Sequence, residues 1–205
     1  MGIVIIDYGL GNLRSVSKAL EAVGAKVEVT NDPDKISKAK AIVLPGVGAF
    51  QRGMENLRRI NVIPFLVKAI KDGKPFLGIC LGLQLLFTES EEHGLHRGLD
   101  IIKGKVKRFE SSMKVPHMGW NSIKFKVSSS KFKVFDGIPS KSYFYFVHSY
   151  YAEPQDEAIV VATTEYGQEF VSAVNKNNIW GVQFHPEKSA KLGLKLLENF
   201  CRDVR

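Results

Sequence analysis

The stretch "PFLGICLGLQLLF", residues 75–87, begins as an apolar run typical of a buried strand and then takes on the character of a helix. Cys80 stands at the change, between Gly78 and Gly82. A strand that passes directly into a helix is the building unit of α/β folds with a parallel sheet. A reactive residue on such a turn, with small neighbours that remove steric conflict, forms a nucleophile elbow. The stretch therefore predicts both a strand–turn–helix unit and a reachable thiol.

The first ninety residues repeat this alternation of strand and helix. Helical spacing of apolar residues occurs over 13–23 and over 63–70. Alternation of this kind predicts an α/β fold with a central, mostly parallel sheet and helices on both faces. The strands of that sheet are expected at residues 3–7, 26–30, 41–44 and 76–80.

From residue 100 onward the apolar residues recur with a period of two, which is typical of half-buried strands. These runs predict antiparallel strands added to the sheet. A last amphipathic segment, 190–204, predicts a helix in which Cys201 packs in the core. The period-two runs cover residues 142–152, 159–166, 169–176 and 179–185.

Length and composition limit the class of protein. The chain has 205 residues, 44% of them hydrophobic, which fits one domain over residues 1–205. No run approaches the roughly 20 apolar residues that span a bilayer, and the N-terminal segment has no signal-peptide pattern. The two cysteines lie far apart and form no zinc or disulfide pattern. We therefore expect a cytoplasmic protein with reduced thiols and no membrane partner.

The net charge of +8 comes from one region, because residues 97–141 hold eleven Lys or Arg and three acidic residues. Most of its lysines alternate with apolar residues, in segments 102–109, 123–127 and 131–135. That period predicts strands with lysines facing water, which commonly protect sheet edges. No nucleic-acid-binding motif accompanies the lysines. Nucleic-acid binding remains the weaker alternative, and no nucleic-acid partner is expected.

The chemistry of Cys80 follows from its expected position at a helix N-terminus. There the helix dipole and unpaired N–H groups stabilise a thiolate. The backbone N–H of Leu81 points the same way and could donate to an oxyanion. The alternative interpretation is a buried structural cysteine at a tight turn.

A cysteine nucleophile needs a base, and the base needs a group that orients it. His185 lies in "VQFHPEKS", with Glu187 two residues on. In an extended chain residues i and i+2 share a side, and Pro186 biases His185 toward that geometry. The alternative is a structural histidine beside a solvated glutamate. The order Cys, His, Glu also differs from that of α/β-hydrolases, in which the acid precedes the histidine.

Two glycine-containing segments are further candidates. In "AIVLPGVGAF", residues 41–50, Gly46 and Gly48 would let the backbone approach a ligand and offer N–H donors. An ordinary Pro-Gly turn is the alternative. "DYGLGN", residues 7–12, is not a dinucleotide fingerprint, because Arg14 stands where the third glycine would be.

The segments "PGVGAF", "GICLGLQLLF" and "GVQFHPEKS", in this order and spacing, resemble the class I (triad) glutamine amidotransferases. That family hydrolyses glutamine to glutamate and ammonia on a three-layer, flavodoxin-like fold. Three more segments, "DYGLGN", "PHMGWN" (116–121) and "YFYFVHSY" (143–150), are similar to the glutaminase subunits of imidazole glycerol phosphate synthases. The resemblance covers essentially the whole chain.

The resemblance implies roles for individual residues and requires no metal or organic cofactor. The catalytic triad would be Cys80, His185 and Glu187. The oxyanion-hole donors would be the backbone of Val47, Gly48 and Leu81, and the amino-acid part of L-glutamine would bind Gln84, Ser149 and Tyr150.

The resemblance also implies a partner, since the glutaminase would use the whole chain and the ammonia needs an acceptor site. That partner would be the cyclase subunit, a (β/α)₈ barrel, in a heterodimer that serves histidine biosynthesis. The residues expected at the interface are Asn12, Pro116, His117, Met118, Gly119, Trp120 and Asn121.

Two alternatives come from other classes. The chain could be an amidotransferase subunit of a different synthase, which "DYGLGN" and "PHMGWN" argue against. It could also be a binding module without catalysis, which the intact Cys80, His185 and Glu187 argue against.

Overall fold

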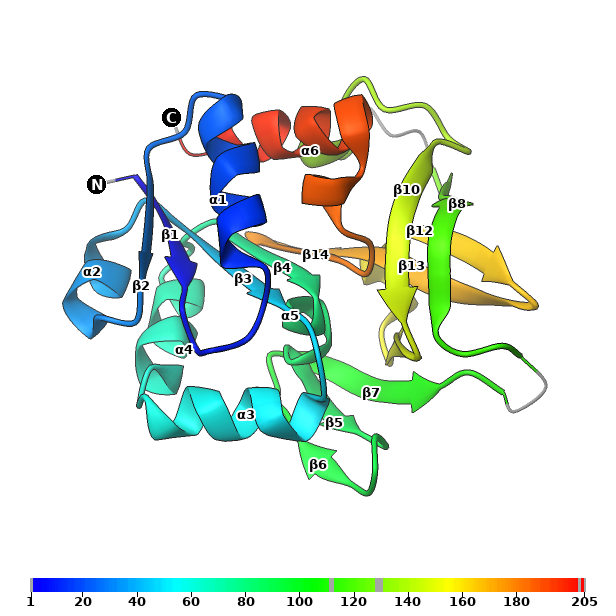
Figure 1. Ribbon diagram of the computed structural model, residues 1–205, viewed down its shortest axis with the longest axis horizontal. Helices are drawn as coiled ribbons and strands as arrows, with labels where there is room; N and C mark the ends of the chain where they lie inside the picture. Colours follow the sequence, from blue (N-terminus) through cyan, green and yellow to red (C-terminus); the bar gives the residue numbers. More distant parts are fainter. Residues whose placement is uncertain (1, 111–112, 128–130, 203, 205) are drawn as a thin grey trace.

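A computed structural model describes residues 2–110, 113–127, 131–202 and 204. Its main sheet has twelve strands, and the first half of that sheet is parallel (Figure 1). Except for the edge strand, Val27–Thr30, these parallel strands are entirely buried and almost entirely apolar, because helices cover both of their faces. In spatial order they are β2 (Val27–Thr30), β1 (Ile3–Ile6), β3 (Ala41–Gly46), β4 (Phe76–Cys80) and β14 (Ile179–Val182).

The four predicted parallel strands are confirmed to within two residues at each end. The largest difference is that β3 continues to Gly46, two residues past its expected end. Gly46 therefore pairs with Cys80 in the parallel register of β3 and β4. Because parallel strands end at one edge of a sheet, this register brings the Pro-Gly-Val-Gly segment beside the cysteine.

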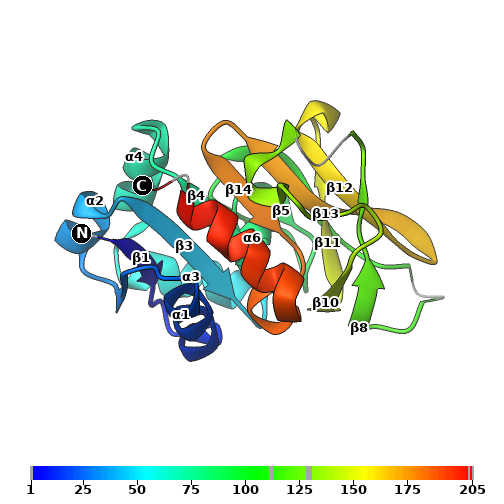
Figure 2. The same cartoon turned by 90° about the horizontal axis from the view of Figure 1, so that it is seen from above.

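Helices cover the parallel strands on both sides, as predicted (Figures 1 and 2). One face packs against α1 (Leu13–Ala22) and α6 (Ala190–Arg202), and the other against α2 (Pro33–Lys38), α3 (Phe50–Arg59) and α4 (Ile63–Lys71). The amphipathic pattern did not reveal α2 and α3. Helix α2 is only six residues long, and its start is marked instead by the Asp32 cap and Pro33.

The second half of the sheet is mainly antiparallel, as predicted, with two corrections. Strand β14 is antiparallel to β13 but parallel to β4, so it completes the parallel region. The strands that continue the sheet are β13 (Gln168–Lys176), β11 (Tyr150–Pro154), β7 (Ile102–Arg108), β5 (Phe87–Ser90) and β6 (His96–Arg97), while β12 (Val160–Tyr166) pairs with β13 and with β9 (Lys124–Phe125).

The second correction concerns the run 142–152, which forms two strands in two different sheets. Among the residues described, strand β10 (Tyr143–His148) pairs only with β8 (His117–Ser122), whereas β11 belongs to the main sheet. The chain changes sheets at Ser149, where the alternation of buried and exposed residues breaks. An almost continuous aromatic run hides such a break from sequence analysis.

The lysine-rich region is partly as expected. Along β7 burial alternates, and Lys103, Lys105 and Lys107 form ion pairs with Asp100, Glu89 and Glu153. However, β7 lies between β11 and β5, so the expectation of an edge strand was wrong.

The predicted strand over 131–135 is also absent. Its place is taken by η2 (Lys133–Phe135), a 3₁₀ helix, because Val134 and Phe135 are both buried and a strand would alternate them. Among the residues described, no helix is long and apolar enough to cross a membrane.

Candidate active site

Cys80 ends β4 and begins α5 (Leu81–Gln84) with φ 54° and ψ −109°. A side-chain-bearing residue rarely adopts this backbone conformation, which is typical of strained functional turns. The two flanking glycines permit it. A Cβ at Gly78 would lie 2.8 Å from the oxygen of Gly82, and a Cβ at Gly82 would lie 1.7 Å from the oxygen of Leu44.

The helix that follows Cys80 is a single turn of four residues. So few aligned peptides give a weaker dipole than the sequence interpretation assumed. Cys80 is also only 5% exposed, so the thiol, which was predicted to be reachable, does not lie on the outer surface. It is reached instead through a cavity of about 500 Å³.

That cavity brings together residues that the sequence predicted separately. Its lining includes the expected oxyanion-hole residues Val47, Gly48 and Leu81, the nucleophile candidate Cys80, and the expected glutamine-binding residues Gln84, Ser149 and Tyr150. The other lining residues are Ala49, Glu92, Pro116, Val147 and His148.

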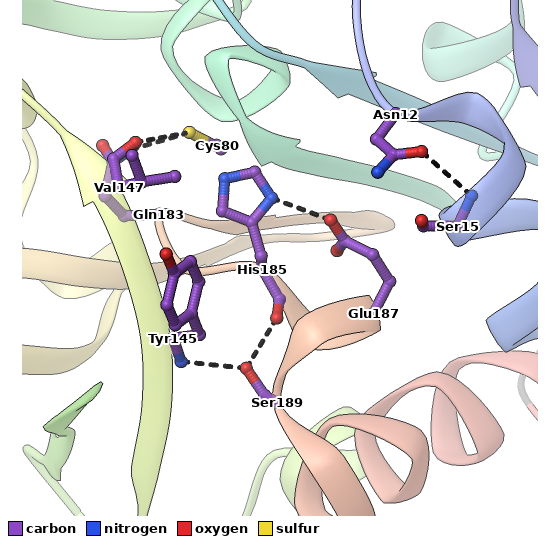
Figure 3. Close-up of polar contacts among 9 residues, drawn as sticks. All are labelled: Asn12, Ser15, Cys80, Tyr145, Val147, Gln183, His185, Glu187 and Ser189. Atoms are coloured by element: carbon purple, nitrogen blue, oxygen red, sulfur yellow. Dashed lines mark hydrogen bonds and ion pairs between the residues drawn. The ribbon is translucent and has the colours of Figure 1, made fainter. Parts of the chain in front are cut away.

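His185 lies next to Cys80, with Glu187 on the other side of its ring, and both side chains are nearly fully buried (Figure 3). His185 Nδ1 is 2.8 Å from Glu187 Oε1. The predicted pairing of these side chains is present, and His185 has the extended backbone expected before Pro186, with φ −103° and ψ 97°. The extended geometry does not continue to Glu187. Pro186–Lys188 form a 3₁₀ turn, η4, rather than an extended chain.

The backbone around His185 is held against β10. The N–H of His185 donates to the oxygen of Tyr145 at 2.9 Å, and the Ser189 hydroxyl donates to the oxygen of His185 at 2.6 Å. The N–H of Tyr145 in turn donates to the Ser189 hydroxyl at 3.0 Å. These bonds hold the backbone from which the imidazole projects, and the contact with Glu187 orients the ring itself.

The proton affinity of His185 depends on its two neighbours. Burial alone would lower its pKa, but the charge of the adjacent Cys80 sulfur and the bond to Glu187 raise it to about 10. Its Nε2 atom is buried and makes no hydrogen bond within the described residues. In Figure 3 the imidazole lies between the sulfur and the carboxylate, so Nε2 is the atom available to the thiol. The arrangement can hold an imidazolium beside a thiolate.

Gln84, which the resemblance implies to bind glutamine, is buried. Its Nε2 donates to the oxygen of Tyr150 at 2.9 Å and to Gln183 Oε1 at 3.1 Å.

Sequence reasoning missed two residues of this site. Glu92 contributes a carboxylate to the cavity, and its Oε2 accepts the N–H of Phe50 at 2.5 Å. Gln183 is fully buried, with its Nε2 3.6 Å from the sulfur of Cys80. Glu92 stands among several acidic residues without any distinguishing pattern. Gln183 could have been found, since it is a polar residue inside the apolar run that leads to His185.

His117 and His148 form a buried pair beside the cavity. His148 Nδ1 is 2.8 Å from the oxygen of Tyr150, which can only accept, so Nδ1 carries the proton. His148 Nε2 therefore accepts from His117 Nδ1 at 3.0 Å, and His117 Nε2 accepts from Asn121 Nδ2 at 3.2 Å. Burial lowers the pKa of His117 to about 4 and that of His148 to about 3. Both rings are neutral at pH 7, and these contacts give His148 a structural role.

This pair predicts loss of stability in acid. The pKa values of His117 and His148 in the folded chain lie below the unfolded value near 6.5. As the pH falls below 6.5, these histidines therefore bind protons in the unfolded chain but stay neutral in the folded chain. Each histidine should then lower the free energy of unfolding by about 1 kcal/mol per pH unit. Urea unfolding between pH 7 and 5 measures the slope. His117→Gln should reduce this slope by the contribution of one histidine, whereas His93→Gln, at an exposed position, should leave the slope unchanged. An unchanged slope in both variants would show that His117 is not held neutral by burial.

The segment expected to meet a partner, 116–121, places its side chains on both sides of β8. Met118 and Trp120 are 66% and 53% exposed, whereas His117 is 4% exposed and faces inward. The His117 side chain is therefore not available on the surface, contrary to the expectation. The Trp120 ring meets the Tyr145 ring edge-on. Lys188 Nζ lies over the Tyr145 ring, 5.6 Å from its centre.

Asn12, the other residue expected at an interface, has a structural task. Its Oδ1 accepts the N–H of Ser15 at 3.2 Å and caps α1 (Figure 3). Loss of such a cap costs about 1 kcal/mol, so an Asn12 variant also changes stability.

In the part of the chain that is described, no three His, Cys, Asp or Glu side chains come together in a group that could hold a metal ion.

Comparison with known proteins gives a consistent result. Residues 4–204 match the family described as glutamine amidotransferase class-I. The HisH subunit of imidazole glycerol phosphate synthase from Aquifex aeolicus is 54% identical over 203 residues, 98% of this chain and 97% of that protein. The HisH subunit from Archaeoglobus fulgidus is 52% identical and covers 99% of both chains.

Solved structures confirm the predicted three-layer fold. A crystal structure of a glutamine amidotransferase superposes with a TM-score of 0.77 at 18% identity, covering 99% of each chain. The PurLQS structure from Thermotoga maritima gives a TM-score of 0.75 at 21% identity, over 99% of this chain and 98% of that one.

Proposed function

Because the chain belongs to the class I glutamine amidotransferases, we propose that its cavity hydrolyses L-glutamine through Cys80, His185 and Glu187. Full-length likeness to HisH subunits makes it the glutaminase subunit of an imidazole glycerol phosphate synthase, acting in histidine biosynthesis. The observation that carries the mechanism is the nucleophile elbow next to a buried His–Glu pair with a 2.8 Å contact. One catalytic domain over residues 1–205 suffices for this reaction.

The first half of the reaction forms a thioester. The thiolate of Cys80 attacks the side-chain carboxamide carbon of glutamine, and the carbonyl oxygen becomes an oxyanion. His185, protonated on Nε2, then gives that proton to the leaving nitrogen, which departs as ammonia. The raised pKa of about 10 depends on the sulfur's negative charge. Once the sulfur is acylated that charge disappears, so the imidazolium becomes a better acid when the leaving group needs a proton.

The second half releases glutamate. With the sulfur acylated, neutral His185 accepts a proton from water, and the resulting hydroxide attacks the thioester. Glu187 holds the ring through Nδ1 and stabilises the imidazolium in both halves. His185 keeps this proton when the thiolate leaves, which restores the starting imidazolium and thiolate. The new carboxylic acid of glutamate loses its own proton to solvent.

The oxyanion would be stabilised by backbone N–H groups at Val47, Gly48 and Leu81, which line the cavity beside the sulfur. Gly48 has φ +98°, which favours glycine there. Each well-placed donor contributes roughly 3 kcal/mol to such a transition state.

The amino-acid end of glutamine would occupy the rest of the cavity, with Gln84, Ser149 and Tyr150 as binding residues. Glu92 is a carboxylate in the lining and is suited to bind the substrate's α-ammonium group.

The released ammonia must reach the site where it is used, which we place on a second subunit. The subunit would therefore form a heterodimer with the cyclase subunit, a (β/α)₈ barrel, in the cytoplasm. Ammonia transfer requires a close contact, because protonated ammonia is lost to solvent and is no longer nucleophilic. Exposed Met118 and Trp120 on β8 form the apolar surface proposed for that contact.

Ammonia release from glutamine, with and without the cyclase subunit, tests the function directly. We expect hydrolysis in the complex, matched by imidazole product. Absence of hydrolysis under both conditions would contradict the proposal.

The interface predicts an effect of Trp120→Ala. An exposed tryptophan often anchors a protein contact, so its removal should weaken cyclase binding about tenfold or more, or uncouple the two reactions. Subunit affinity and the ratio of glutamate to imidazole product are the measurements. Val127→Ala, a change at another exposed apolar residue, is the control. Equal affinity and an equal ratio in Trp120→Ala and the unchanged protein would place the interface elsewhere.

A further inference from the structure

We propose that Gln183 is a positioning residue whose amide N–H holds the thiolate of Cys80 and ties it to the glutamine-binding residue Gln84. The proposal rests on the glutaminase function proposed above. Gln183 follows β14 directly, is fully buried, and has its Nε2 3.6 Å from the sulfur. Figure 3 shows its side chain at the sulfur, from the side opposite Glu187.

The direction of this amide follows from its neighbours. The oxygen of Tyr150 can only accept, so the group of Gln84 that meets it at 2.9 Å is the NH₂. The second hydrogen of that NH₂ then points to Gln183 at 3.1 Å, which must present its oxygen. The NH₂ of Gln183 is therefore the group turned toward the sulfur. The orientation of both amides is fixed by one backbone carbonyl.

The sulfur of Cys80 has different partners in its two charge states. As a thiol it can donate to the oxygen of Val147, at 3.9 Å. As a thiolate it cannot donate, and the Val147 oxygen repels it. Gln183 Nε2 is then the side-chain amide that can donate to it, in addition to His185. A hydrogen bond to an ionised group is stronger than one to a neutral group, so Gln183 favours the thiolate.

The other ionisable groups near the sulfur do not replace this contact. His185 lies on one side, with Glu187 behind it. Burial and the charge of Cys80 raise the pKa of Tyr8, so its hydroxyl stays neutral, and it has no hydrogen-bond partner among the described residues. Glu92 lines the cavity and adds negative charge, which opposes the thiolate.

The hydrogen bonds from Gln84 to Gln183 and from Gln183 to the sulfur link substrate binding to the nucleophile. Both hydrogens of the Gln84 amide are used, so its oxygen is the group left to meet glutamine. A substrate that draws on this oxygen polarises the Gln84 amide and strengthens its bond to Gln183. Gln183 then donates more strongly to the sulfur when glutamine is bound.

The test compares Gln183→Met and Gln183→Glu with Ser172→Ala. Ser172 is also fully buried, and its hydroxyl makes no hydrogen bond within the described residues. Alkylation of Cys80 by iodoacetamide is followed by mass spectrometry against pH, on the full-length chain, with Cys80→Ala as the blank. Steady-state kcat and KM for glutamine are measured in the complex with the cyclase subunit.

Gln183→Met should move the midpoint of the alkylation profile up by about one pH unit and lower kcat about tenfold, because a bond to a charged group is lost. Gln183→Glu should move it further, since a carboxylate repels the thiolate. Gln84→Met removes the hydrogen bond to Gln183 together with the contacts to Tyr150 and to glutamine, but leaves the Gln183 amide in place, so it should give a smaller shift and a higher KM. Ser172→Ala should leave the profile unchanged.

A folded Gln183→Met with the original midpoint would overturn the proposal. If that variant fails to fold, the nearly isosteric Gln183→Glu decides, and an unshifted midpoint there overturns it too. A shift equally large in Ser172→Ala would show a merely structural effect and would also overturn it. Alkylation does not need glutamine, so a protein without glutaminase activity but with the shifted profile would contradict the proposed function alone.

Discussion

Cys80→Ala is expected to abolish glutamine hydrolysis, with a loss of at least about 10⁴-fold in kcat, because removal of a nucleophile leaves only binding and oxyanion contacts. The fold should persist. The change deletes one sulfur atom from a side chain that is 5% exposed, and it leaves the glycines around the elbow unchanged. A loss of about 1 kcal/mol in unfolding free energy is the most that so small a deletion should cause.

Cys201→Ala is the matched control. Cys201 is also 5% exposed, but it lies in α6, in the core and outside the cavity lining. It should keep full glutaminase activity. In the complex, Cys80→Ala should still convert externally added ammonia to product, because the proposed acceptor site belongs to the cyclase partner. Substantial glutamine hydrolysis by folded Cys80→Ala would show that another group carries the reaction.

His185→Ala should cost nearly as much as loss of the thiol, and Glu187→Ala should cost about 100-fold less than His185→Ala. The base is needed for both proton transfers. Glu187 only orients the ring and stabilises its protonated form through the 2.8 Å contact. Single-turnover rates of thioester formation separate the two losses. A larger loss in Glu187→Ala than in His185→Ala would reverse the assignment of base and orienting group.

Loss of the Glu187 carboxylate should also change the pH dependence of the reaction. The Glu187 carboxylate helps to raise the pKa of His185, so its removal should lower that pKa and shift the protonation of the ring to lower pH. Glu187→Gln keeps the shape and a hydrogen bond but removes the charge, and it should show the same direction of shift. A thermal unfolding measurement on each variant controls for the buried, unpaired atoms that the substitutions create.

The sequence predicted the parallel sheet and the residues of the candidate triad because both depend on local patterns. Buried parallel strands are continuous apolar runs, and the glycines around Cys80 are next to it in the chain. Glu187 lies close enough to His185 that even the wrong backbone geometry, an extended chain instead of a 3₁₀ turn, led to the right pairing.

What the sequence did not predict depends on contacts between distant segments. Glu92 approaches the cavity because its carboxylate caps the N-terminus of α3, about 40 residues earlier. Gln183 meets Cys80 and Gln84 only after β14 has paired with β4. The inward position of His117 follows from the register of β8 with β10, which no pattern in either strand specifies.

The crowding around the elbow glycines also limits how this protein can be evolved in the laboratory. Every single-base missense change of a glycine codon introduces a Cβ, and at Gly82 that atom would fall 1.7 Å from the Leu44 oxygen. A mutant library that randomises residues 78 or 82 would thus consist mostly of unfolded members. Gly48 and Gly119, where a Cβ would meet nothing within 4 Å, accept added volume, although their positive φ angles disfavour it. Selection for altered substrate or partner use should therefore concentrate its diversity on the cavity rim and the exposed face of β8, and leave the turn itself untouched.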